Sequence, residues 1–272
     1  MPAKRVLGYV ALGVTSVVAL VPTLWILVLS LRTTKDVAED PFGLPVPPTL
    51  ANYTEAWSTA RFGDYLLNSF LIALGAVVLV VLTGLLAAFG MTTLRPPGSG
   101  ALLAVFLVGM TLPIWALINP LFRLMRDTGL LDTRSGVILV EAAIGLPLAI
   151  FLFRSFLRDI PEDLIEAAVI DGATPLRILV HVTAPLAIPV VYTVVVFQFM
   201  FSWNEFVIPL FLLQSDEART LPLGLSYFQG RYGSDQSLVS AGAIMASAPI
   251  VVVYLLFQRH FVTGLTAGAV KG

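Results

Sequence analysis

The chain has 272 residues, of which 57% are hydrophobic and 12% are charged, whereas a soluble domain carries about 25% charged side chains. So few charges cannot coat a globule in water, and the long apolar runs therefore indicate a protein that lies in a lipid bilayer. The formal net charge of -1 is uninformative, but the lack of a basic run argues against a nucleic-acid partner. The sequence has no cysteine, which excludes disulfides and thiolate metal sites.

Uncharged runs long enough to cross a bilayer, which needs about 20 apolar residues, recur along the chain. We expect membrane spans at residues 6–31, 66–94, 101–122, 135–156, 189–213 and 238–257. Spans of this length must be helical, because lipid offers no hydrogen bonds to bare backbone. The first run exceeds the apolar core of about 7–15 residues found in signal peptides, so we expect a permanent helix there. These observations predict an all-α integral membrane protein, with residues 1–272 forming one transmembrane domain of six bundled helices.

Prolines lie inside several of these expected spans, among them Pro113, Pro147 and Pro209. Each proline removes a backbone donor and frees the carbonyl group four residues earlier. One interpretation is ordinary kinking, which neighbouring helices tolerate by satisfying the freed groups. The other is that the freed groups line a cavity.

Residues 157–186, between the fourth and fifth expected spans, contain two sets of helix signals. Pro161 suits a first helical position, and Gly172 can take the left-handed conformation that ends a helix. Thr174 can cap a second helix and Pro175 can open it. The pattern predicts a helix, a tight turn and a helix. The first helix is amphipathic, with its apolar side at Leu164, Ile165 and Ala168, and it is too short to span. The segment should therefore lie at the membrane surface, either as a solvated link or docked in a groove of a partner.

The spacing of residues in this segment is similar to that of a known motif. Glu166-Ala167-Ala168 is followed after three residues by Gly172, and after nine more by Val182 with Pro185 beyond it. This pattern resembles the EAA loop of binding-protein-dependent ABC importer permeases, although that family usually has isoleucine at Val182 and leucine at Ala184. The resemblance extends to the maltose-type branch of carbohydrate importers, through Asp171-Gly172-Ala173, Asn68-Ser69, Leu130-Leu131-Asp132-Thr133, Trp203-Asn204-Glu205-Phe206 and the C-terminal run from Gln258 to Gly272.

The resemblance implies an orientation that charge counting does not supply. With six spans, the sixteen Lys and Arg residues divide into eight on each side, so the positive-inside rule decides nothing. In the family the EAA loop is cytoplasmic, which implies that both termini of this chain are cytoplasmic as well. The implied location is the cytoplasmic (inner) membrane of a bacterium or archaeon.

The resemblance also implies partners and a mechanism. The family's permeases form a heterodimer with a second homologous permease, and they work with two ATPase subunits and an extracytoplasmic sugar-binding protein. The sequence has no G-x-x-x-x-G-K-[ST] loop to cradle phosphates, so we expect no enzyme activity in this chain, and ATP and Mg in the partner ATPase. The residues implied in ATPase coupling by alternating access are Glu166, Ala167, Ala168, Asp171 and Gly172.

Polar residues inside the fifth expected span form a second candidate site. Gln198, Ser202 and Glu205 recur at i, i+4 and i+7, which places them on one helix face beside Asn204. Polar groups in a span are costly and mark a functional site by default, so the four residues are candidates for the path of a neutral sugar. The alternative is that Glu205 is a satisfied structural carboxylate near the outer interface. We interpret Glu141, near the outer headgroups, and Arg154, which can snorkel, as structural.

Other features of the sequence leave alternatives open. The outer segment Gln214–Ser237 either contacts a binding protein or is a solvated loop. His181 and His260 have no second ligand at metal spacing, so we expect no metal site. A membrane enzyme and a self-contained channel or carrier are the competing functional classes. The sequence has no H-E-x-x-H motif and no nucleophile elbow to favour an enzyme, and a self-contained carrier would need no docking loop.

Overall fold

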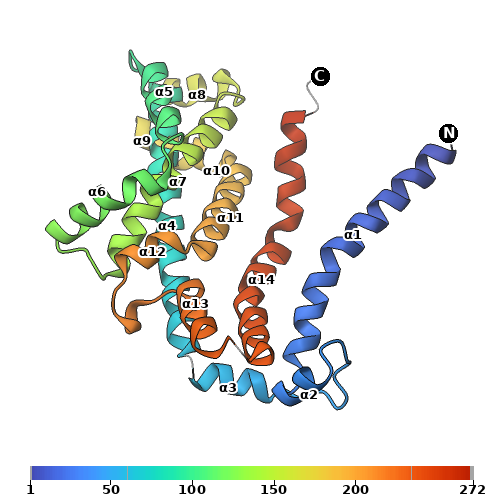
Figure 1. Ribbon diagram of the computed structural model, residues 1–272. Helices are drawn as coiled ribbons and strands as arrows, with labels where there is room; N and C mark the ends of the chain where they lie inside the picture. Colours follow the sequence, from blue (N-terminus) through green and yellow to red (C-terminus); the bar gives the residue numbers. More distant parts are fainter. Residues whose placement is uncertain (1, 60, 234, 270–272) are drawn as a thin grey trace. The chain divides into compact units, whose positions relative to one another are not determined.

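A computed structural model describes the backbone of residues 2–59, 61–233 and 235–269, and the side chains of residues 6–58, 61–226, 230–233 and 235–256. The described backbone forms helices joined by loops and contains no strand, as the sequence predicts. It divides into two compact units. Unit 1 comprises residues 1–66 and 221–249, and unit 2 comprises residues 67–220 and 250–272. Figure 1 shows the helices in sequence colours.

Four helices in the described part of the chain are long and apolar enough to cross a membrane. They are residues 6–30 of α1 (Pro2–Ser30), α4 (Phe62–Phe89) with the π-helix η1 (Gly90–Leu94), α7 (Arg134–Leu157), and residues 236–256 of α14 (Gln236–Ala269). Two bent helix pairs also qualify. One joins α5 (Ser99–Gly109) to α6 (Ile114–Asp127) at 99°, and the other joins Pro175–Leu186 to α11 (Ile188–Asn204) at 76°. By length and composition, the described residues thus hold four candidate spans, or up to six if each bent pair is one span.

Two expected spans are wrong as continuous helices. The run 101–122 breaks between Gly109 and Ile114, because Pro113 has no backbone N–H and takes an extended conformation before α6. The run 189–213 breaks at Glu205, whose backbone is extended between α11 and α12 (Val207–Leu212). Glu205 lies four residues before Pro209, which cannot bond to its carbonyl group. The prolines therefore interrupt these spans rather than merely kinking them.

Unit 1 contains two short helices, α2 (Thr34–Glu39) and α3 (Ala51–Thr59), together with α13 (Leu221–Tyr232). Thr33 and Asp36 form a reciprocal capping box at the start of α2. The buried Asn52 amide joins α3 to the end of α1, because its Nδ2 donates to the carbonyl groups of Ser30 and Arg32, both at 2.8 Å. These contacts fix the turns of unit 1 through side chains that satisfy backbone groups.

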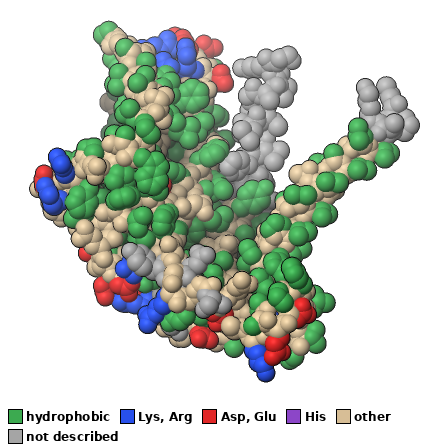
Figure 2. All heavy atoms as spheres, viewed as in Figure 1, with side chains coloured by type: hydrophobic (Ala, Val, Ile, Leu, Met, Phe, Trp, Pro, Cys, Tyr) green, Lys and Arg blue, Asp and Glu red, His purple; other side chains and the backbone are tan. Residues whose placement is uncertain are grey.

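The core of unit 2 lies where α4, α7 and α11 pack together. Phe153 and Ile150 of α7 are fully buried there. Gly84 of α4 brings the two backbones close, because a Cβ atom at this position would lie 3.2 Å from the Ala149 side chain. Figure 2 shows hydrophobic side chains on the flank of unit 2 and charged side chains gathered around α8 (Glu162–Ile170) at its end. An exposed apolar flank, which includes Val105, Val108 and Trp115, suits contact with lipid rather than water.

Candidate functional site

The segment that resembles the EAA loop folds as a helix, a turn and a helix. The first helix, α8, starts after Pro161, which occupies the N-cap position rather than the expected first helical position. At the other end, Gly172 has φ +77° and its N–H donates to the Val169 carbonyl at 2.9 Å. The Ala173 N–H donates to the Ala168 carbonyl at 2.9 Å. Together these bonds form a Schellman motif, in which glycine takes the left-handed position without a Cβ penalty.

The second helix starts directly after this turn. Thr174 caps it by accepting a hydrogen bond from the Arg177 N–H at 3.4 Å, and Pro175 occupies its first turn. The helix runs through α9 (Pro175–Ile178), the π-helix η2 (Leu179–Thr183) and α10 (Ala184–Leu186) before the bend into α11. Two helices are thus joined by four residues, from Asp171 to Thr174.

The two faces of α8 have different environments. Ile165 and Ala168 pack against the core of unit 2, whereas Leu164, expected on that same side, is 46% exposed. The apolar side chains of Val169 and Ile170 are exposed as well, Ile170 to 85%. Glu166, Ala167 and Asp171 are also exposed. The outer face therefore presents apolar surface flanked by two carboxylates, which is a surface suited to a partner protein.

An ion pair ties α8 to the end of α4. Arg95 follows η1 in a left-handed conformation, with φ 47°, and its Nε donates to the Thr92 carbonyl at 2.9 Å. Its guanidinium group pairs with the Glu162 carboxylate in the first turn of α8. Both side chains are largely exposed, so the pair orients α8 rather than contributing much stability.

The polar residues expected on one face of α11 separate into two environments. Gln198 and Ser202 are buried on the side that faces α7, where the Ser202 hydroxyl donates to the Glu141 carboxylate. Glu141 is fully buried against protein. A Cβ atom on Gly145 would collide with the Gln198 amide oxygen. The absence of a side chain at Gly145 therefore admits Gln198 between the two helices.

Asn204 and Glu205 do not share that face. Asn204 is exposed, and its Nδ2 donates to the Met200 carbonyl at 2.7 Å. Glu205 lies beyond the end of α11, and its Oε1 accepts from the backbone N–H groups of Val207 at 2.7 Å and Ile208 at 3.1 Å. Glu205 thus satisfies the free amides at the start of α12, which is the structural role left open as the alternative.

A cavity of about 290 Å³ opens beside Gln198. Its walls are mostly apolar and include Phe197, which directly precedes Gln198, and Phe201 from the next turn of α11. Within the side chains that the structure describes, the Gln198 Nε2 and the Glu141 Oε1 have no hydrogen-bond partner. Aromatic rings can pack against the face of a sugar ring, and a free amide donor beside them can bond one of its hydroxyl groups.

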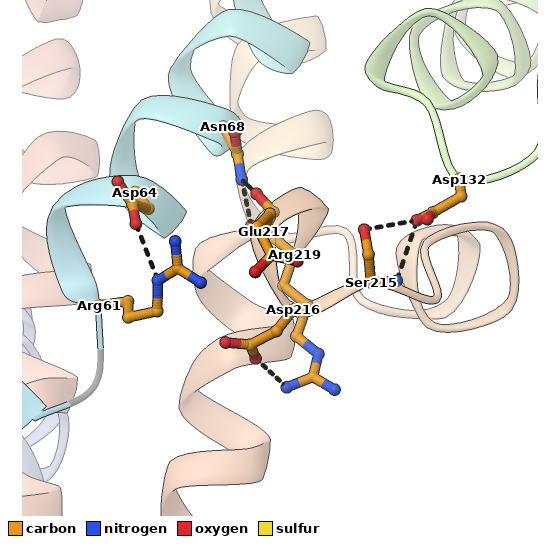
Figure 3. A network of polar contacts seen from close by, with 8 residues as sticks. All are labelled: Arg61, Asp64, Asn68, Asp132, Ser215, Asp216, Glu217 and Arg219. Carbon is orange, nitrogen blue, oxygen red and sulfur yellow. Dashed lines mark hydrogen bonds and ion pairs between the residues drawn. The ribbon is translucent and has the colours of Figure 1, made fainter.

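A third polar constellation holds the segment between α12 and α13, and the sequence did not predict it. Figure 3 shows Asp132, from the α6–α7 connection, pointing at Ser215. Asp132 Oδ1 accepts from the backbone N–H of Gln214 at 2.8 Å and from both the N–H and the hydroxyl of Ser215 at 3.0 Å. The Asp132 N–H donates to the Leu212 carbonyl at 2.8 Å. One residue thus fixes the end of α12.

Asn68 of α4 holds the other end of the same segment. Its Nδ2 donates to the carbonyl groups of Glu217 at 2.7 Å and Arg219 at 2.9 Å, and its Oδ1 accepts from Arg134 Nε at 2.8 Å. Asn68 is buried, with 1% of its surface exposed, whereas Glu217 is exposed. The backbone of segment 214–219 is thus held by the buried Asn68 and the half-buried Asp132, while side chains such as that of Glu217 remain exposed.

The pKa of Asp132 reflects these contacts. Burial acts to raise the pKa of its carboxyl group, but the backbone amides of Ser215 and Gln214 and the Ser215 hydroxyl stabilise the carboxylate, and the pKa lies below its ordinary value. Asp132 is therefore ionised throughout the physiological range. Among the described side chains, no three His, Asp or Glu residues lie close enough together to hold a metal ion.

Comparison with known proteins gives matches over most of the chain. Residues 80–266 match the family described as binding-protein-dependent transport system inner membrane component. The trehalose transport system permease protein SugB of Mycobacterium tuberculosis is 39% identical, over 93% of each chain. The diacetylchitobiose uptake system permease protein NgcG of Streptomyces coelicolor is 34% identical, over 94% of this chain and 85% of that one.

Two further comparisons extend this similarity. The trehalose/maltose transport system permease protein MalG of Thermococcus litoralis is 33% identical, over 99% of this chain and 98% of that one. A chain of a bacterial ABC transporter involved in the import of the acidic polysaccharide alginate superimposes with a TM-score of 0.82 and 25% identity, over 96% of this chain and 97% of that one. The fold is therefore similar over nearly its whole length.

Proposed function

The chain belongs to the family of binding-protein-dependent transport system inner membrane components, and on that premise we propose that it is a permease subunit of a sugar ABC importer. The names of its relatives give trehalose, diacetylchitobiose and trehalose/maltose as cargo. These names support a di- or oligosaccharide, or a related polyol, as the cargo of this protein. The chain forms half of the transmembrane pathway, and a second homologous permease forms the other half.

In the proposed arrangement each bent helix pair is one span, so residues 1–272 form a single permease domain with six spans. An even number of spans puts both termini on one side of the membrane. We assign that side, together with α8 and α9, to the cytoplasm of a bacterium or archaeon. Support comes from the four long helices and the two bent pairs, and from the place of α8 and α9 directly after α7.

The coupling of ATP hydrolysis to transport is assigned to α8 and the turn that follows it. The observation that carries this assignment is the exposed outer face of α8, which ends in the Schellman turn at Gly172. Two ATPase subunits bind ATP and Mg, and this chain contacts one of them through Glu166, Ala167, Asp171 and Gly172, with Ala168 packing beneath. Glu166 is exposed, so a basic group on the ATPase can reach it.

The mechanism is alternating access. Closure of the ATPase dimer on ATP moves α8, and α8 moves α7 and α11 because Ile165 and Ala168 pack on the same core as these two helices. Coupling between two sites requires an element with two states whose equilibrium both sites can shift. The rigid helix pair is such an element, because nucleotide binding acts on it from the ATPase side and sugar binding acts on it from the transport pathway. Hydrolysis then returns the pathway to its inward-open state.

The sugar path is assigned to α11, with Gln198, Ser202, Asn204 and Glu205 as its candidate residues. The cavity beside Gln198 favours this amide as the hydroxyl partner, whereas Glu205 already bonds the start of α12. Uptake kinetics of Gln198→Ala and Glu205→Gln test the assignment. A raised KM for the sugar in the Gln198 variant is expected, and an unchanged KM in both variants would leave all contacts to the partner permease.

The contact with the extracytoplasmic sugar-binding protein is assigned to the segment 214–219 and to the α13 region that follows it in the chain. The segment is presented on a backbone held by Asp132 and Asn68, which suits a docking surface because little ordering is needed on binding. Deletion of residues 224–233 is expected to weaken docking of the binding protein. Docking that survives this deletion would contradict the proposed contact.

Copurification tests the proposed function as a whole. The chain is coexpressed with its second permease and ATPase subunits, and Glu166→Lys is compared with Glu55→Lys, which makes the same charge change on the exposed face of α3 in unit 1. We expect the first variant to lose the ATPase subunits and uptake, and the second to keep the ATPase subunits. If Glu166→Lys retained both the ATPase subunits and sugar uptake, the coupling role of this residue would be contradicted. If the isolated chain transported solute without its partners, its proposed function as a permease subunit of an ABC importer would be contradicted.

A further inference from the structure

A polar cavity of about 690 Å³ lies under α8, between η1 and the last turn of α7. Its walls carry three guanidinium groups, from Arg95, Arg154 and Arg158. The apolar floor includes Leu157 and Ile165. The coupling role uses the outer face of α8, with only Glu166 also lining this cavity, and the sugar path lies along α11, so neither accounts for the three arginines.

Two hydrogen-bond donors in the wall lack an acceptor. Thr183 is 1% exposed, and its hydroxyl has no partner among the described residues. The Nε of Arg154 is likewise buried without a partner there. A buried donor without an acceptor costs about 1–3 kcal/mol, and more when it is charged. Both residues line the cavity, so a ligand that accepts hydrogen bonds there would supply the missing partners after a small side-chain adjustment.

The charge of the cavity favours an anion as that ligand. The Arg95 guanidinium is already paired with Glu162, so Arg154 and Arg158 face one remaining carboxylate, Glu166, in the wall. Guanidinium groups bind phosphate oxygens in a planar, bidentate manner. A tetrahedral phosphate has enough oxygen atoms to accept from two arginines and from the Thr183 hydroxyl at once.

The depth of Arg154 along its helix points to the membrane surface. Arg154 lies 20 residues after Arg134, the first residue of α7, which is about 30 Å at 1.5 Å per residue. This length equals the hydrocarbon thickness of a bilayer, about 30 Å. A guanidinium group at this depth lies at the level of lipid headgroups, where basic pockets between helices bind anionic lipids.

We propose that the cavity bounded by Arg154, Arg158 and Thr183 binds a phosphate group, which either an anionic phospholipid headgroup or a soluble phosphorylated compound supplies. The bound phosphate bridges the end of α7 to η2, and so stiffens the base on which α8 rests. The proposal requires the membrane location but not sugar import, so it can fail while the proposed function stands.

The test uses the purified importer, with its partner permease and ATPase subunits, in lipid nanodiscs. Discs of phosphatidylcholine alone are compared with discs that also contain phosphatidylglycerol, and inorganic phosphate is titrated into the first kind. Native mass spectrometry counts retained phosphatidylglycerol, and thermal unfolding reports binding of phosphate. The variants are Arg154→Gln and Thr183→Val, and the control is Arg126→Gln, which removes an exposed arginine of α6 that pairs with Asp127.

Wild type and the Arg126 control are expected to bind phosphate alike. Arg154→Gln is expected to weaken binding about tenfold or more, because a hydrogen bond to a charged group is lost, and Thr183→Val to weaken it about threefold to tenfold. Retention of phosphatidylglycerol with no response to inorganic phosphate assigns the lipid headgroup, and a response in phosphatidylcholine discs assigns a soluble phosphate. The proposal would be overturned if wild type bound neither phosphatidylglycerol nor inorganic phosphate. It would also be overturned if Arg154→Gln and Thr183→Val bound phosphate as tightly as wild type.

Discussion

Asp132 and Ser215, which are 83 residues apart in the chain, are joined by two hydrogen bonds to the same carboxylate oxygen. Asp132 has φ 58°, and this left-handed conformation turns both its carboxylate and its backbone N–H toward the end of α12. The contact connects the start of α7 to the segment between α12 and α13. In the proposed importer it therefore connects a span to the surface that receives the binding protein.

Removal of the Asp132 carboxylate should loosen this segment. In Asp132→Ala the amides of Gln214 and Ser215 lose their acceptor, and alanine also tolerates the left-handed backbone poorly. We expect local opening to become easier by about 2 kcal/mol, which is about thirtyfold faster amide exchange. Asp132→Asn keeps an acceptor oxygen and suits the backbone, so its effect should be smaller. Hydrogen–deuterium exchange of peptides covering residues 213–220 measures both, and unchanged exchange in the alanine variant would contradict the clamp.

The dependence of this clamp on pH follows from the lowered pKa of Asp132. A carboxyl group whose pKa is lower in the folded state contributes stability above its unfolded pKa of about 3.9. That contribution is lost as the pH falls through the lowered value. The melting temperature of wild type should therefore exceed that of Asp132→Asn by a constant amount between pH 8 and pH 5. The difference should shrink only below about pH 4, and shrinkage already between pH 7 and pH 5 would be inconsistent with a stabilised carboxylate.

Local sequence signals predicted the helix ends near α8 because they act through neighbouring residues. Gly172 takes the left-handed conformation that its place after Asp171 indicates, and Thr174 caps the next helix. Proline chemistry also marked both places where an expected span is interrupted, but hydropathy alone could not decide between a kink and a break. The break at Glu205 depends on its carboxylate, which satisfies the amides of Val207 and Ile208.

Long-range polar contacts could not be predicted in the same way. Nothing near Asn68 in the sequence indicates that it bonds a backbone segment about 150 residues away. Nothing near Asp132 indicates that it bonds the same segment, about 80 residues away. The burial of Glu141 depends on Ser202 and on the close approach of α7 to α11. The sequence of either helix taken alone does not predict this approach. The pairing of Gly145 with Gln198 is likewise visible only once the two helices are packed.

The turn after α8 gives a prediction about coupling that does not involve side-chain contacts. A Cβ atom at Gly172 would meet nothing within 4 Å, so Gly172→Ala acts only through the left-handed backbone, at a cost of about 1–2 kcal/mol. We expect the affinity for the ATPase subunits to fall about fivefold to thirtyfold. Gly98→Ala is the matched control, since Gly98 has φ +86° and equally open surroundings but lies before α5. Equal losses of ATPase binding in the two variants would show that general strain, not the coupling turn, is responsible.

The close approach of α7 to α11 gives a prediction about packing. In Gly145→Ala the new methyl group collides with the buried Gln198 amide oxygen, and overpacking of this kind costs about 1–3 kcal/mol. Gln198→Ala removes the obstacle, so the double variant should be more stable than the sum of the two single effects predicts. Gly109→Ala is the control, because its Cβ atom would meet nothing within 4 Å. Thermal unfolding of the purified importer measures all four variants. Strictly additive changes would mean that α7 and α11 do not meet through Gly145 and Gln198, and the cavity assigned to the sugar path would lose the wall that Gln198 provides.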